Sequence, residues 1–95
     1  MKPEFLKGTV LVDFWAPWCS PCKVFAPTLE KVMKDFSGIK LLKVNVDEEA
    51  GVAEELGVLG IPCLILLKDG KEVARIAGSL SETMLRKKLG EGVSK

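Results

Sequence analysis

The sequence of 95 residues contains no histidine, no tyrosine and only three cysteines. Without histidine, neither a Ser–His–Asp triad nor a histidine general base can form. Three cysteines cannot by themselves supply the four ligands of a structural zinc site, and Lys23 after Cys22 rules out a C-x-x-C-H haem signature. A fold held together by disulfides would be expected to carry more cysteines, in an even number. We therefore expect no metal and no cofactor, and the remaining candidate chemistry is that of sulfur.

The chain also lacks an excess of charge and a long hydrophobic run. Fourteen Lys and Arg against thirteen Asp and Glu leave a net charge of +1, too little to favour binding to nucleic acid. The longest apolar run, residues 61–67, is far shorter than the roughly 20 residues that span a membrane. The first eight residues lack the apolar centre of a signal peptide. We therefore expect a cytoplasmic protein that binds neither nucleic acid nor membranes, provided that no leader has been removed.

The pattern of hydrophobic residues predicts one domain, residues 1–95, of the α/β class. With 47% hydrophobic residues, a chain of this length can bury a core of its own. Strand–helix–strand order indicates a parallel crossover, and Asp69-Gly70 is typical of a two-residue hairpin. We expect a mixed central sheet with helices on both faces. The expected strands are residues 9–15, 40–46, 63–67 and 71–77, and the expected helices are residues 19–36, residues 48–56 and one that opens with a capping box at residues 79–82.

Side-chain spacing supports the two longer helices. Pro27 lies inside the first of them, where the missing N–H should kink it. The expected core stripe of that helix is Phe25, Leu29, Val32, Met33 and Phe36, and that of the last helix is Leu80, Met84, Leu85 and Leu89.

The motif Cys19-Ser20-Pro21-Cys22 lies between the first strand and the helix that follows it. Unpaired N–H groups at a helix N-terminus favour an anion, so we expect the pKa of the Cys19 thiol to be lowered. Cys22 lies three residues on, within reach of a disulfide, and Pro21 stiffens the first helical turn. Cys19 would attack a substrate disulfide, and Cys22 would resolve the mixed disulfide. The alternative is half of a zinc ribbon or a chance spacing.

At this point the sequence resembles the thioredoxin family, closely and over nearly its whole length. The match is carried by several separate motifs in the right order, which makes it more specific than the two cysteines alone. These motifs are residues 12–19, residues 21–23, Pro27, residues 43–47, residues 60–62 and residues 68–70. The resemblance implies the thioredoxin fold and a protein disulfide reductase that is itself reduced by a thioredoxin reductase-type electron donor.

The resemblance also implies roles for residues outside the motif. Asp13 would be a buried acid that exchanges a proton with Cys22, with Lys43 near it; otherwise Asp13 reaches water at a strand end and Lys43 faces outward. Pro62 would be cis and would pack beside the cysteines, although trans is the common state. An apolar substrate groove would be formed by Trp18, Val46, Gly60, Ile61, Ala77 and Gly78. Core packing is the competing interpretation for tryptophan, and it suits Trp15 better than Trp18.

The sequence departs from the family pattern at three places. Ser20 replaces the usual glycine, which would alter the reduction potential and partner fit. Cys63 replaces the usual threonine; it is either a small residue that starts a strand or a thiol for an alternative disulfide, for redox sensing or for a three-thiolate metal or iron–sulfur cluster. The first strand and most of the first helix of the family are missing, with residues 5–7 as a remnant of that helix. The strand at residues 40–46 could then be a sheet edge open to dimerisation, although we expect a monomer.

Three functions therefore stand beside one another. The first is a thioredoxin-like protein disulfide reductase and electron carrier, with Cys19 as nucleophile and Cys22 as resolving thiol. The second is a disulfide oxidase or isomerase of the same fold. The third is a non-catalytic thiol-rich module that binds a partner or carries a metal.

Overall fold

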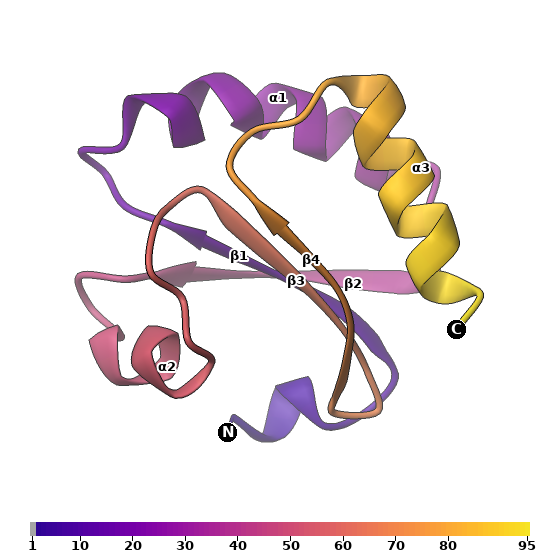
Figure 1. Ribbon diagram of the computed structural model, residues 1–95, viewed down its shortest axis with the longest axis horizontal. Helices are drawn as coiled ribbons and strands as arrows, with labels where there is room; N and C mark the ends of the chain where they lie inside the picture. The colour runs from indigo at the N-terminus through magenta and orange to yellow at the C-terminus, as the bar shows by residue number, and fades with distance from the viewer. Residues whose placement is uncertain (1) are drawn as a thin grey trace.

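The centre of the structure, a computed structural model that describes residues 2–95, is a four-stranded mixed sheet (Figure 1). The strand order is β2-β1-β3-β4, with β1 parallel to β2 and antiparallel to β3, and β4 antiparallel to β3. This confirms the predicted α/β class and the hairpin at Asp69-Gly70. The strands are β1 (Thr9–Trp15), β2 (Ile39–Asn45), β3 (Cys63–Lys68) and β4 (Lys71–Ala77).

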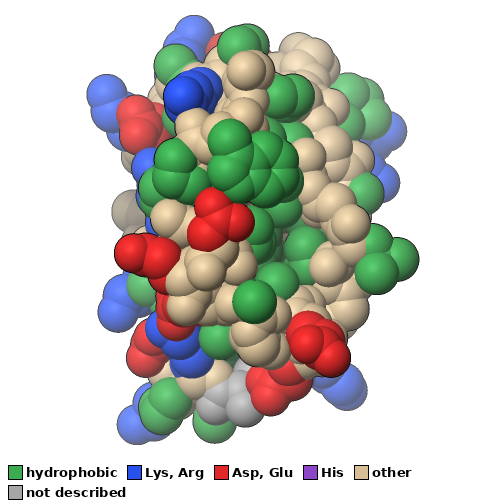
Figure 2. Space-filling model, turned by 90° about the vertical axis from the view of Figure 1, so that its left-hand side faces the viewer, with side chains coloured by type: hydrophobic (Ala, Val, Ile, Leu, Met, Phe, Trp, Pro, Cys, Tyr) green, Lys and Arg blue, Asp and Glu red, His purple; other side chains and the backbone are tan. Residues whose placement is uncertain are grey.

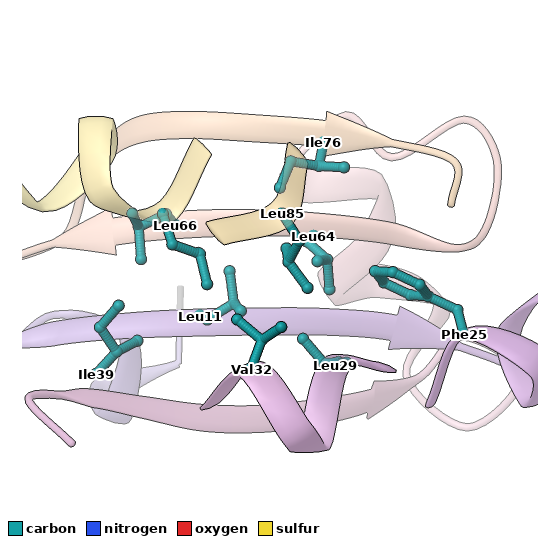
Figure 3. Close-up of a cluster of buried hydrophobic side chains, with 10 residues drawn as sticks. Leu11, Phe25, Leu29, Val32, Ile39, Leu64, Leu66, Ile76 and Leu85 are labelled. Carbon is teal, nitrogen blue, oxygen red and sulfur yellow. The ribbon is translucent and has the colours of Figure 1, made fainter. Parts of the chain in front are cut away.

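Helices cover both faces of this sheet, as predicted (Figure 1). Helices α1 (Ser20–Met33) and α3 (Glu82–Val93) pack on one face, where their side chains meet Leu11, Leu64 and Leu66 (Figure 3). Helix α2 (Ala50–Glu55) and the short 3-10 helix η1 (Pro3–Phe5) lie on the other face. Five consecutive residues in the middle of β1 and five in β3 are buried, because both faces of these strands are covered.

Several element boundaries differ from the predicted ones, most of all the end of α1 and the start of α3. Helix α1 ends at Met33, and a turn whose Phe36 N–H donates to the Met33 carbonyl carries Phe36 onto the core. The N-cap of α3 is Ser81, whose hydroxyl accepts from the Met84 N–H at 3.2 Å, so the predicted capping box at residues 79–82 is wrong. Leu80 precedes this helix and packs on the core from outside any helix or strand, and Met84 is exposed, so neither belongs to a buried stripe of α3.

The chain before β1 is hydrogen-bonded to the turn between β3 and β4. Phe5 is 1% exposed and packs beneath the sheet on the α2 face. The Gly8 N–H donates to the Asp69 carboxylate at 2.9 Å, and the Asp69 N–H donates to the Gly8 carbonyl at 2.9 Å. Within residues 2–95 no strand precedes β1, and β2 is an edge of the sheet as expected.

A search of the described helices for a membrane span finds none that is long and apolar enough.

The close packing of α3 against β3 generates a stability prediction at Gly92. A Cβ at this position would lie 2.4 Å from Leu66 Cδ2 and 3.4 Å from Ala74 Cβ, and Leu66 is itself buried. Because overpacking a core typically costs about 1–3 kcal/mol, Gly92→Ala should lower the free energy of unfolding despite the better helix propensity of alanine. Urea denaturation measures this change.

Gly90 provides the matched control in the same helix, since a Cβ there meets nothing within 4 Å. Gly90→Ala should raise the free energy of unfolding by about 0.5–1 kcal/mol. Equal effects of the two substitutions would contradict the packing argument.

Candidate active site

The two cysteines of the motif lie where β1 leads into α1. Cys19 is the N-cap of α1 in extended conformation, and Pro21 occupies the first turn. Cys19 and Cys22 are joined by a disulfide, with their Cα atoms 5.3 Å apart. The Cys22 N–H donates to Cys19 Sγ at 3.2 Å. A helix N-terminal amide that points at this sulfur favours the thiolate over the thiol once the disulfide is reduced.

The disulfide rests against side chains from three other segments. Trp15, Val46 and Ile61 pack against the buried group formed by Ala16, Cys19 and Cys22. Ile61 precedes Pro62 through a cis peptide bond, as the family resemblance implied. The Pro62 carbonyl accepts from the Gly78 N–H at 2.8 Å, which ties this loop to the end of β4. The structure thus brings Ile61, the residue joined to Pro62 by the cis bond, against the cysteine pair.

Asp13 is buried behind Cys22 rather than exposed at a strand end. It is 8% exposed and lines a pocket of about 230 Å³ together with Cys22, Lys43, Trp15, Lys23 and Ala26. Burial raises the pKa of Asp13 to about 6, and the positive charge of Lys43 acts in the opposite direction. A carboxyl group with such a pKa can both accept and donate a proton near neutral pH.

Lys43 lies beside Asp13 and also faces outward, so both interpretations made from the sequence apply to it. It is the register partner of Asp13 in the parallel β1–β2 pair, which explains its effect on that carboxyl group. Its side chain is nevertheless largely exposed, and its ammonium group lies 3.4 Å from the Glu30 carboxylate. Glu30 was not predicted, since only the packing of α1 against β2 brings the two residues together.

The six residues expected to form one groove line two adjoining hollows, which share the loop of residues 58–61. Trp18 and Val46 line a hollow of about 290 Å³, whereas Ala77 and Gly78 line another of about 340 Å³. Gly60 and Ile61 line both, because the loop that carries them runs between the hollows. Figure 2 shows this side of the molecule, with hydrophobic side chains gathered across its middle and acidic ones at their border.

The two tryptophans differ as expected. Trp18 is 66% exposed, and its indole N–H donates to the Asp47 carboxylate at 2.9 Å. Trp15 is partly buried beside the disulfide. Asp47 was not assigned a role from the sequence, although it belongs to a motif that carried the resemblance.

Ser20 and Cys63, the two residues that differ from the family pattern, lie in different surroundings. Ser20 is the exposed first residue of α1. Cys63 is free, 3% exposed and opposite Ala77, and it packs with Ile65 and Leu67 on the α2 face of the sheet. Burial raises the pKa of the Cys63 thiol. Among residues 2–95, no three Cys, His, Asp or Glu side chains are grouped so as to hold a metal ion.

Comparison with known proteins agrees with this geometry. The family model described as Thioredoxin matches residues 4–91. Thioredoxin 1 of Synechococcus elongatus is 42% identical over 87 residues, which cover 88% of this chain and 81% of that protein. The thioredoxin of Pseudomonas aeruginosa is 48% identical over 79 residues, or 82% of this chain and 73% of that protein. That of Chlamydia caviae is 51% identical over 71 residues, or 75% and 70% of the two chains.

The match spans nearly the whole chain and includes the disulfide-bonded pair at the start of α1. The chain therefore belongs to the thioredoxin family and is a thiol–disulfide oxidoreductase.

Proposed function

We propose that the protein reduces disulfides of other proteins, with Cys19 as the nucleophile and Cys22 as the resolving thiol. The Cys19 thiolate attacks one sulfur of the substrate disulfide, and the other substrate sulfur leaves as a thiolate and is protonated. Cys22 then attacks Cys19 in the mixed disulfide and releases the second substrate thiol. Two electrons pass to the substrate, and the cysteine pair ends as a disulfide.

The observation that carries this assignment is the different surroundings of the two sulfurs. Cys19 Sγ accepts a helix N-terminal N–H, which suits a thiolate that attacks first. Cys22, and not Cys19, lines the pocket that contains Asp13 and Lys43. This shared pocket supports our assignment that Asp13 takes the proton of Cys22 during resolution and returns it in the reverse step. Lys43 sets how readily Asp13 gives up its own proton.

The substrate would lie across the two hollows on either side of the loop at Gly60 and Ile61. Ile61 of this loop packs against the disulfide, the Pro62 carbonyl accepts from the Gly78 N–H, and the small residues Gly60 and Gly78 allow a partner backbone to come close. Trp18, Val46 and Ile61 supply apolar contact, and Ala77 lies on the far side of the loop.

Electrons must be returned to the pair after each cycle, so we assign the protein a thioredoxin reductase-type partner. Continuous reduction suits the cytoplasm, where thiols are kept reduced. A monomer is supported by Lys40 and Lys43 on β2, because exposed lysines on an edge strand oppose pairing with a second sheet. No feature of residues 2–95 favours the oxidase, isomerase or metal-carrying alternatives.

The order of attack predicts opposite results for two serine variants. Cys22→Ser should accumulate mixed disulfides through Cys19, because the resolving thiol is gone. Cys19→Ser should trap none and should lose turnover of a protein disulfide. Non-reducing gel electrophoresis after mixing with an oxidised protein substrate checks both. Trapping by Cys19→Ser instead would reverse the assignment.

The burial of Asp13 predicts how stability varies with pH. The pKa of Asp13 in the folded protein is about 6, above its ordinary value of 3.8, so ionisation of this group destabilises the fold. The resulting loss in the free energy of unfolding is absent below about pH 4, grows as the pH rises through about 6, and reaches about 3 kcal/mol at neutral pH. Asp13→Asn should therefore be more stable than the wild type near pH 7 and similar to it near pH 4. Denaturation of the oxidised proteins at both pH values measures this.

The same variant tests the role of Asp13 in resolution. Asp13→Asn should slow the breakdown of a mixed disulfide by at least about tenfold and should remove the inflection near pH 6 from its rate profile. Stopped-flow kinetics on a preformed mixed disulfide resolve this step. A variant with the expected gain in stability but an unchanged rate profile would make Asp13 a buried acid without a part in proton transfer.

We propose that Ser20 and Pro21 tune the reduction potential and that Cys63 is a buried structural residue. Because Cys63 is 3% exposed and the pKa of its thiol is raised, it should react with iodoacetamide far more slowly than free cysteine while the Cys19–Cys22 disulfide is intact. Mass spectrometry of the oxidised protein measures the rate, and unfolding in urea provides the control. Fast labelling of the folded protein would support a redox-sensing thiol instead.

A further inference from the structure

Leu59 is the most exposed of the large hydrophobic side chains in residues 2–95. It is fully exposed in the loop between α2 and β3, between Gly57 and Gly60. It belongs to none of the three buried clusters, so the core does not account for a leucine at this position. A single exposed leucine is ordinary, but an exposed leucine that extends an apolar surface marks an interaction site.

Leu59 extends such a surface. It lines the hollow of about 290 Å³ together with Trp18, and no residue that lines this hollow is charged. Val46 and Ile61 line the same hollow and also pack against the disulfide, so the hollow adjoins the redox pair. On this side of the molecule, hydrophobic side chains cross the middle and acidic ones border them (Figure 2).

The base of the loop is held in place by Arg75 of β4. Its guanidinium group donates to the Leu56 carbonyl at 2.6 Å and to the Gly57 carbonyl at 3.2 Å. The Glu72 carboxylate accepts two further hydrogen bonds from the same group, at 2.8 and 3.0 Å. At the other end of the loop, the Pro62 carbonyl accepts a hydrogen bond from the Gly78 N–H. Leu59 is therefore presented from a segment that is anchored at both ends.

Trp18 lines the same hollow, and its indole N–H donates to the Asp47 carboxylate, which limits the movement of the ring. An uncharged hollow lined by two large apolar side chains fits an apolar side chain and leaves a charged one without a partner.

We propose that Leu59 contacts the substrate and, together with Trp18, selects protein substrates that carry a large apolar side chain next to the disulfide to be reduced. This inference rests on the proposed reductase function and names the substrate class of the same site. Arg75 acts on this preference as a positioning residue, because it hydrogen-bonds the base of the loop and does not line the hollow that Leu59 shares with Trp18.

The test uses two peptides with the same disulfide, which differ only in having leucine or lysine beside the reacting cysteine. The reduced wild type should reduce the leucine peptide with a kcat/KM about three to ten times higher. In Leu59→Ser this preference should disappear, mainly through a higher KM for the leucine peptide. In Leu59→Glu the lysine peptide should become the better substrate.

Val24→Ser is the matched control, since Val24 is 78% exposed on α1 and does not line the hollow. It should keep the preference of the wild type. All variants should react at the same rate with a small linear disulfide such as 2-hydroxyethyl disulfide, which shows that fold and redox pair are intact. Arg75→Gln should weaken the preference, and Arg75→Lys should restore part of it.

Each outcome has a distinct meaning. A preference that survives in Leu59→Ser, or that falls equally in Val24→Ser, overturns the selecting role of Leu59. A wild type that reduces both peptides equally well overturns this inference and leaves the reductase function standing. A wild type that reduces neither peptide, yet reacts with the small disulfide, overturns the proposed function itself.

Discussion

The burial of β1 on both faces is the constraint on which the rest of the structure depends. Its central position between β2 and β3 means that α1 and α3 must cover one face while α2 and η1 cover the other. The strand therefore has to end where the covered layer ends, and the chain turns there into α1. Cys19 lies at that turn, so the Cys22 N–H in the first turn of α1 donates to its sulfur. The reactive position is a consequence of how the sheet is covered.

The same burial gives Asp13 its chemistry. A carboxyl group in a strand of hydrophobic residues loses hydration, and its pKa rises because the charged form is disfavoured. The neighbouring strand places Lys43 beside it, which keeps the shift moderate. The same burial that makes ionised Asp13 destabilising also gives it the pKa that suits the proton exchange proposed above.

The substrate side of the site depends on segments that are distant along the chain. The loop that carries Gly60 and Ile61 is held by hydrogen bonds at both ends. Arg75 near the end of β4 donates to the Leu56 carbonyl at the start of the loop, and Gly78 just after β4 donates to the Pro62 carbonyl at its end. This arrangement divides the expected groove into two hollows. One is apolar and contains Trp18, and the other includes Arg75.

The sequence by itself determined the elements and the reactive pair, because these follow from local rules. Hydrophobic periodicity located the strands and helices, and the spacing of Cys19 and Cys22 beside a strand–helix junction indicated disulfide exchange. The resemblance added the cis proline at Pro62. Local rules were weakest at helix ends: Ser79 and Ser81 both suit an N-cap, and in the structure Ser81 is the cap while Leu80 before it packs on the core.

Only the tertiary structure decided what depends on distance between segments. Whether Asp13 is buried depends on the helix packed over it, and its partner Lys43 is thirty residues away along the chain. The contact of Lys43 with Glu30, the anchoring of the loop by Arg75 and the exposure of Leu59 likewise leave no periodic pattern in the sequence. Burial and electrostatics arise from the assembled fold, so no short stretch of residues can encode them alone.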